Sequence, residues 1–203
     1  MTPQQVETLF RMGKDYAFAR WSCPIAPVVF GVDDATLAVV KGAFEAVVAL
    51  AGHRMAGNDP ELGANCMVFF LRDWGELAGL PQLERLLPGV SDLAARLQAD
   101  DADRYRGLHF DDSGAIRSAF VFLRMSGPLA DIPAEDLALA EVVQVILRWS
   151  DSAFATASPL ARHDGRTILR PEIAALIRAA YDPVLPAASR DPAHALRLAA
   201  RLR

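Results

Sequence analysis

The pattern of hydrophobic and polar positions begins with a helical period. Thr2 and Gln5 have the spacing of a capping box, and Pro3 suits the first position of a helix. Apolar residues then recur every three or four positions. This pattern predicts an N-terminal helix over residues 1–20.

Two strand-like runs flank a second helical pattern. Residues 28–32 and 65–71 are rich in β-branched and aromatic residues, which predicts two short buried strands. An apolar stripe over 37–51, capped by Asp33 or Asp34, predicts a long helix between them. Strand, helix and strand in this order predict a parallel pair joined by a crossover helix.

The second half of the chain changes pattern several times. Irregularly placed Gly, Pro and Leu over 73–103 predict short helices packed on the sheet. Strand-like runs over 107–110 and 115–123, joined by the turn residues 111–114, predict an antiparallel hairpin. Three more helices are predicted, from 131 to about 150, from 171 to 181 and from 191 to the C-terminus, with a loop leading to His163 after the first of them.

These elements predict an α+β fold in a single domain over residues 1–203. Its parts are the N-terminal helix (1–20), an α/β core with a mixed twisted sheet (28–152) and a C-terminal helical subregion (163–203). A chain of this length buries enough surface to fold without disulfides or metals.

The composition and net charge argue against two kinds of partner, nucleic acids and a membrane that the chain would span. With 52% hydrophobic residues, 23% charged residues and a net charge of −4, the chain lacks the basic field that a nucleic-acid surface needs. No apolar run reaches the length of a membrane span, and the first residues do not resemble a signal peptide. We expect a cytoplasmic location as the sequence stands, or a periplasmic or secreted one if a leader has been removed. The oligomeric state stays open.

The two cysteines, Cys23 and Cys66, are too few for a zinc ribbon or an iron–sulfur site. Free thiols are favoured over a disulfide because no secretory context is visible, but both remain open.

The helix around residue 140 carries the most informative chemistry. Its sequence Ala140-Glu141-Val-Val-Gln144 has the spacing of the zinc-protease motif H-E-x-x-H, in which two histidines hold the metal and the glutamate activates a water molecule. Alanine has no lone pair, and a glutamine amide is a poor zinc ligand. We therefore expect no catalytic residues, no metal and no cofactor.

A helix that is apolar nearly all round is buried, so Glu141 needs hydrogen-bond partners. One interpretation is that Gln144 and Arg148, on the same face of the helix, hold Glu141 in a satisfied polar cluster. The other is that these three residues line the floor of a former active-site cleft that still binds a ligand.

The order of elements, together with this helix, resembles the core of the zincin metallopeptidases. More specifically, the chain resembles a bacterial family of unknown function with a zincin-like plan. The segments that carry this resemblance are Arg-Trp-Ser-Cys-Pro at 20–24, the helix with Glu141 and Gln144 through 152, and 164–183, which opens with Asp-Gly-Arg-Thr.

The resemblance implies that Glu-x-x-Gln is usual in this family and that some members look like lipoproteins or exported proteins. It also implies a pseudoenzyme, which is a non-catalytic zincin-like domain that binds or scaffolds a peptide or protein partner. The candidate binding residues are Glu141, Gln144, Arg148 and His163.

Two alternatives remain. One is a metal-dependent hydrolase with non-standard ligands, in which Glu141 and His163 are joined by Asp151 or Asp164. The other is an interaction module that uses the C-terminal helices as its working surface.

Overall fold

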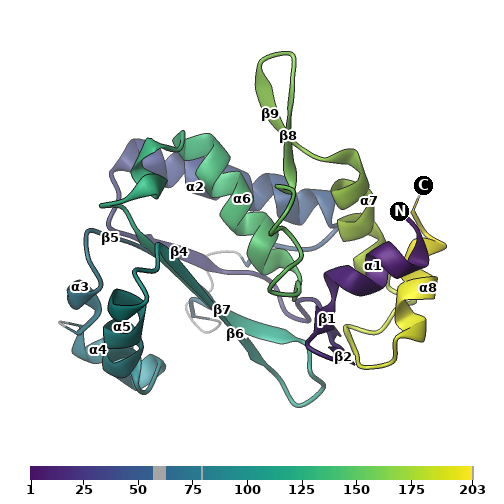
Figure 1. The fold of residues 1–203 in the computed structure, drawn as a ribbon, viewed down its shortest axis with the longest axis horizontal. Helices are drawn as coiled ribbons and strands as arrows, with labels where there is room; N and C mark the ends of the chain where they lie inside the picture. The colour runs from purple at the N-terminus through teal and green to yellow at the C-terminus, as the bar shows by residue number, and fades with distance from the viewer. Residues whose placement is uncertain (57–62, 79, 203) are drawn as a thin grey trace.

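A four-stranded mixed sheet lies at the centre of the protein in a computed structural model that describes residues 1–56, 63–78 and 80–202. The strands follow the order β4 (Pro27–Phe30), β5 (Cys66–Leu71), β7 (Ile116–Arg124) and β6 (Arg104–Phe110). The first three are parallel, and β6 pairs antiparallel with β7 at one edge. The predicted α+β class, parallel pair and hairpin are therefore confirmed (Figure 1).

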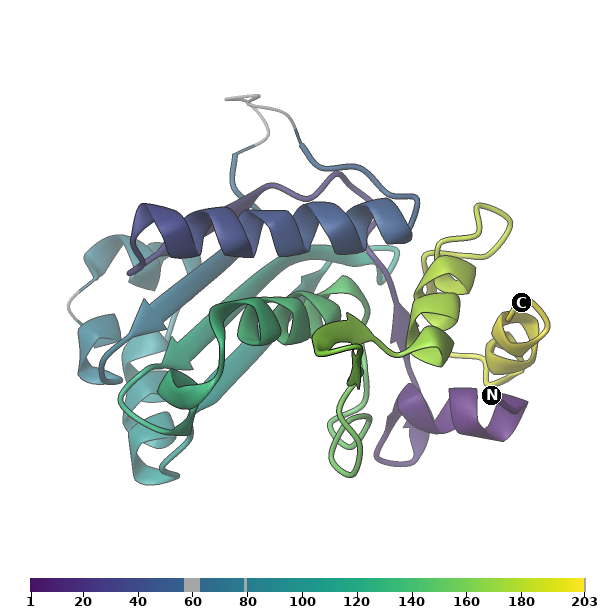
Figure 2. The ribbon, with the colours of Figure 1, turned by 90° about the horizontal axis from the view of Figure 1, so that it is seen from above.

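Two long helices cover one face of the sheet. The predicted crossover helix is α2 (Asp34–Leu50), and it begins where the Asp33 side chain accepts a hydrogen bond of 2.8 Å from the Thr36 N–H. It lies beside α6 (Ala134–Ile146), which follows the 3₁₀ turn η1 (Pro128–Asp131) (Figure 2). Phe44 of α2 and Val142 of α6 belong to the main hydrophobic core with Val121 of the sheet.

Three short helices cover part of the other face, as the sequence predicts. They are α3 (Gly75–Ala78), α4 (Pro81–Leu86) and α5 (Val90–Ala99). Trp74 and Leu97 form a second apolar cluster there with Phe120 and Phe122 of β7. Because β7 alternates, Ala119 and Val121 point instead into the main core.

The helix predicted over residues 1–20 is much shorter than expected. The capping box of Thr2 and Gln5 is confirmed, but α1 spans only Pro3–Leu9. Its last carbonyl groups are taken by a distant residue, because Ser150 donates from N to Leu9 O at 2.7 Å and from Oγ to Thr8 O at 3.2 Å. The chain then forms three very short strands, which are β1 (Arg11–Met12), β2 (Asp15–Tyr16) and β3 (Phe18–Ala19).

The C-terminal part is less purely helical than predicted. The expected loop is present over 151–159, but His163 lies in a hairpin of β8 (Leu160–His163) and β9 (Arg166–Leu169). Its turn residues Asp164 and Gly165 both have positive φ. The predicted helices α7 (Pro171–Ala180) and α8 (Ala193–Ala199) follow, with β10 (Ala188–Ser189) between them. β10 pairs with β3, and α8 packs on α1, so the two ends of the chain meet (Figure 1).

Among the described helices, none combines the length and the apolar character that crossing a membrane would need.

Candidate functional site

Glu141 is a buried carboxylate, with only 4% of its surface exposed. Arg106 donates to both of its oxygens, from Nε to Oε2 at 2.6 Å and from Nη2 to Oε1 at 2.7 Å. Arg104 adds a bond of 3.1 Å from Nη1 to Oε1 and donates from Nε to Asp103 Oδ1 at 3.0 Å. These charge-assisted bonds replace the water that Glu141 loses on burial.

The alternation of β6 explains why two arginines reach the same carboxylate. Residues two apart point to the same face of a sheet, so Arg104 and Arg106 both face α6 and Glu141. Tyr105, between them, lies on the opposite face and stacks on Phe122 with ring centroids 5.9 Å apart.

The prediction that Gln144 and Arg148 hold Glu141 is wrong. The helix ends before Leu147, which is extended (φ −136°, ψ 159°) and forms a β-bridge with Arg20. Arg148 therefore does not follow Gln144 along a helical face. The prediction considered only neighbours on one helix, whereas the partners come from a strand across the sheet.

Three aromatic donors explain why α6 ends early, since the last carbonyl groups of a helix lack partners within it. The donors are two indole N–H groups and one phenol. The bonds run from Trp21 Nε1 to Val145 O at 2.8 Å, from Tyr181 Oη to Ile146 O at 2.9 Å and from Trp149 Nε1 to Val143 O at 2.7 Å.

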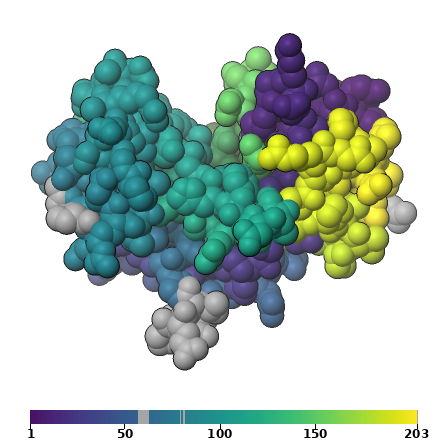
Figure 3. All heavy atoms as spheres, turned by 90° about the horizontal axis from the view of Figure 1, so that it is seen from below, coloured from purple at the N-terminus to yellow at the C-terminus, as the bar shows by residue number. Residues whose placement is uncertain are grey.

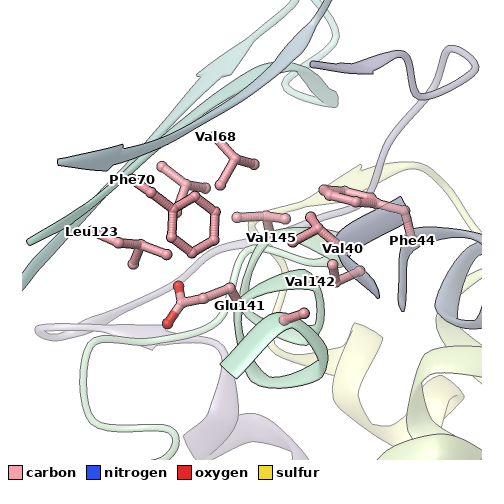
Figure 4. A pocket seen from close by; sticks show the side chains of 10 residues that line it. Val40, Phe44, Val68, Phe70, Leu123, Glu141, Val142 and Val145 are labelled. Carbon is pink, nitrogen blue, oxygen red and sulfur yellow. The ribbon is translucent and has the colours of Figure 1, made fainter. Parts of the chain in front are cut away.

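The apolar side of Glu141 is tightly packed core and not a ligand pocket. The space between α2, α6 and the sheet measures only about 10 Å³, which is at most enough for one water molecule. Figure 4 shows this space between Val40, Phe44, Val68 and Phe70, with the carboxylate of Glu141 directed away from it. This space is therefore too small for a ligand.

A cleft of about 670 Å³ lies between β6 and the segment that follows α6. In Figure 3 a notch separates the teal part of the chain, which contains β6, from the purple and green segments that form the opposite wall. The apolar lining includes Leu108, Phe110 and Phe154. The charged and polar lining consists of Arg104, Arg106, Gln144, Arg148, Ser150 and Asp151.

Arg148 is held differently from the other two arginines. Its guanidinium carbon lies 4.8 Å from the centroid of the Phe110 ring, which is a cation–π contact. Burial lowers the pKa of Arg148, the nearby Arg190 lowers it further, and Asp151 acts in the opposite direction. Gln144, the second predicted binding residue, is half-buried and also lines the cleft.

His163, the remaining predicted binding residue, does not join this cleft. It lies in β8 on a hairpin that projects from the body of the protein (Figure 1), and its ring Nε2 is 3.4 Å from Asp164 Oδ2. The His163 side chain is 73% exposed. Across residues 1–56, 63–78 and 80–202, no group of three or more His, Cys, Asp or Glu side chains is placed to hold a metal ion.

The sequence analysis missed Arg104, Arg106 and Phe110 as site residues. The alternation from Arg104 to Phe110 was a usable signal, because it places every second residue on one face of a strand. The need of Glu141 for a cationic partner was a second signal.

Both cysteines are free thiols, as the sequence favours. Burial raises the pKa of the Cys66 thiol to about 12, which suits a core residue. Cys23 is half-buried and lies outside the cleft.

Comparison of the chain with protein-family models, with curated proteins and with solved structures finds no match.

Proposed function

We propose that this protein is a non-catalytic domain with a zincin-like plan that binds a peptide segment of a partner in the cleft between β6 and the end of α6. One observation carries the proposal. Both oxygens of Glu141 are hydrogen-bonded to the guanidinium groups of Arg104 and Arg106. The carboxylate therefore has a structural role.

A general base must have a free oxygen to take a proton from the attacking water. A metal-bound water also requires residues nearby that coordinate the metal ion. Glu141 meets neither need, because two positive groups occupy its oxygens and would repel a divalent cation. Ala140 and Gln144 stand at the positions of the two zinc-binding histidines. The hydrolase alternative also needs His163, which lies on the projecting hairpin.

The order of elements supports the zincin-like plan. A strand, a long helix, a second parallel strand, an antiparallel hairpin and then the glutamate-bearing helix follow one another along the chain. The antiparallel strand of the hairpin, β6, is the edge strand next to that helix. The topology and the position of Glu141 are thus the two observations that support the proposed plan.

The lining of the cleft supports a peptide as its ligand. In the described part of the chain, β6 pairs on one side only, so its outer edge presents unpaired backbone groups. An extended peptide adds to such an edge through main-chain hydrogen bonds, while its side chains enter neighbouring pockets. Leu108 and Phe154 offer apolar surface beside that edge.

Metal analysis tests the proposal directly. We expect protein purified without chelator to contain far less than one zinc per chain, and its binding to peptides selected from a random octapeptide library to be unchanged by EDTA. Phe154→Ala, in the cleft, should weaken this binding, whereas Val184→Ala, at a site 79% exposed and outside the cleft, should not.

One zinc per chain, together with peptide hydrolysis that Glu141→Gln abolishes, would favour the hydrolase alternative instead. Failure of every selected peptide to depend on Phe154 or another cleft residue would sink the binding proposal.

A further inference from the structure

The three arginines that line the cleft differ in whether a carboxylate of the protein already pairs with them. Arg104 and Arg106 share the carboxylates of Glu141 and Asp103. Arg148 forms no ion pair with any described residue, and no described residue accepts a hydrogen bond from its guanidinium group. Its charge is therefore available to a ligand.

The position of Arg148 is fixed from two sides. Its backbone N–H donates to Ala19 O at 2.9 Å, and its guanidinium carbon lies 4.8 Å from the centroid of the Phe110 ring. A guanidinium that rests on an aromatic ring loses less conformational freedom when it pairs with an anion, because the ring already restricts it.

The charges around Arg148 favour an anion. Arg190 is close enough to lower the pKa of Arg148, and Asp151 is the acidic group that opposes this effect. Asp103 and Glu141 balance Arg104 and Arg106, so the charges left around Arg148 are its own, that of Arg190 and that of the opposing Asp151. These three sum to one positive charge, although the whole chain has a net charge of −4. Partial burial also removes water from Arg148, so a bound anion would restore its lost partners.

We infer that Arg148 recognises a carboxylate, so that the peptide bound in this cleft is acidic; the inference rests on the proposed function. A carboxylate matches the planar fork of a guanidinium. Gln144 adds amide donors in the same cleft, and Leu108 and Phe154 provide room for an apolar side chain beside the acidic one. The open edge of β6 supplies the backbone contacts that a peptide needs and a small free anion cannot use.

A peptide library tests this inference with the full chain. Octapeptides with random sequence are selected for binding, and each binder is compared with an analogue in which its Asp and Glu are replaced by Asn and Gln. We expect binders to be enriched in Asp and Glu. Replacing the acids should raise the Kd of the unmodified protein about tenfold and have almost no effect on Arg148→Gln, since the charged pair is then already lost.

Two further variants control the measurement. Arg148→Lys keeps the charge without the fork, and we expect it to retain the preference for acidic peptides with a weaker Kd. Arg162→Gln makes the same exchange at a side chain 68% exposed on the projecting hairpin, and should bind as the unmodified protein does.

The outcomes separate the two proposals. Binders without acidic enrichment, or an acid-to-amide effect of equal size in Arg148→Gln, would overturn the inference and leave peptide binding intact. If the library yields no binder, peptide binding fails and the inference fails with it.

Discussion

At the scale of the residue, the free-energy cost of burying the Glu141 carboxylate is offset by hydrogen bonds from two arginines. Burial of a carboxylate is unfavourable, and the bonds from Arg104 and Arg106 offset this cost only while all three groups are present. Both arginines keep some contact with solvent, with side chains 32% and 22% exposed. We therefore expect the cluster to fix geometry more than it adds stability.

Glu141→Gln should lower the free energy of unfolding by about 2–3 kcal/mol, because it leaves two guanidinium groups facing a neutral amide. Urea unfolding measures this loss. The matched control is Glu7→Gln, which removes a surface ion pair with Arg11 and should cost less than about 1 kcal/mol.

A triple variant gives the complementary result. Replacing Glu141 by Leu and both Arg104 and Arg106 by Met removes the charges together, and its stability should return to within about 1–2 kcal/mol of the unmodified protein. A triple variant less stable than Glu141→Gln would show that the ion pairs themselves stabilise the fold.

At the scale of the element, helices and strands end where distant groups approach their backbone. The carbonyl groups at the end of α6 are taken by Trp21, Trp149 and Tyr181. The chain after β4 passes so close to β5 that a Cβ atom on Gly31 would lie 2.1 Å from the carbonyl oxygen of Phe70. Element ends are thus set by neighbours as well as by local sequence.

Gly31→Ala and Gly165→Ala separate close approach from backbone strain. Both glycines have positive φ (81° and 76°), but a Cβ on Gly165 meets nothing within 4 Å. We expect Gly165→Ala to cost about 1 kcal/mol and Gly31→Ala roughly 3 kcal/mol or more in urea unfolding. Equal losses would mean that the backbone after β4 shifts to accept the methyl group.

At the scale of the whole molecule, the two ends of the chain close on each other. His194 of α8 is 1% exposed, its Nδ1 lies 3.0 Å from the hydroxyl of Tyr16, and its ring centroid lies 4.3 Å from that of Phe18. Burial lowers the pKa of His194 to about 4, with Arg197 acting in the same direction. The junction therefore needs a neutral imidazole.

The stability of the protein should fall as the pH drops from 7.5 to 5. Because the pKa of His194 is about 4 in the folded state and near 6.5 when unfolded, the unfolded chain takes up the proton first. The expected loss from this group is roughly 2 kcal/mol over that interval. Unfolding in urea at the two pH values measures it.

His194→Asn keeps a polar atom near Tyr16 but does not titrate, so it should remove most of this pH dependence. His53 provides a smaller contribution of the same sign, because burial also lowers its pKa. An unchanged slope in His194→Asn would place the pH dependence elsewhere.

The sequence by itself determined the elements whose pattern is local. The strand, long helix and strand over 28–71, the hairpin turn at 111–114 and the cap at Asp33 follow from hydrophobic period, propensity and turn chemistry within a few residues. The unusual character of Glu141 was also visible, because a carboxylate in an apolar helix is out of place wherever that helix lies.

Only the tertiary structure decided which groups meet. The partners of Glu141 lie 35 and 37 residues away, and the donors that end α1 and α6 come from segments up to 142 residues away. The helix expected over 1–20 ended at Leu9 for the same reason. The hairpin that carries His163 has a local cause instead, the turn at Asp164 and Gly165, which the sequence analysis did not use. Local periodicity describes which side of an element is apolar, but it does not describe which backbone or charge the folded chain brings to that side.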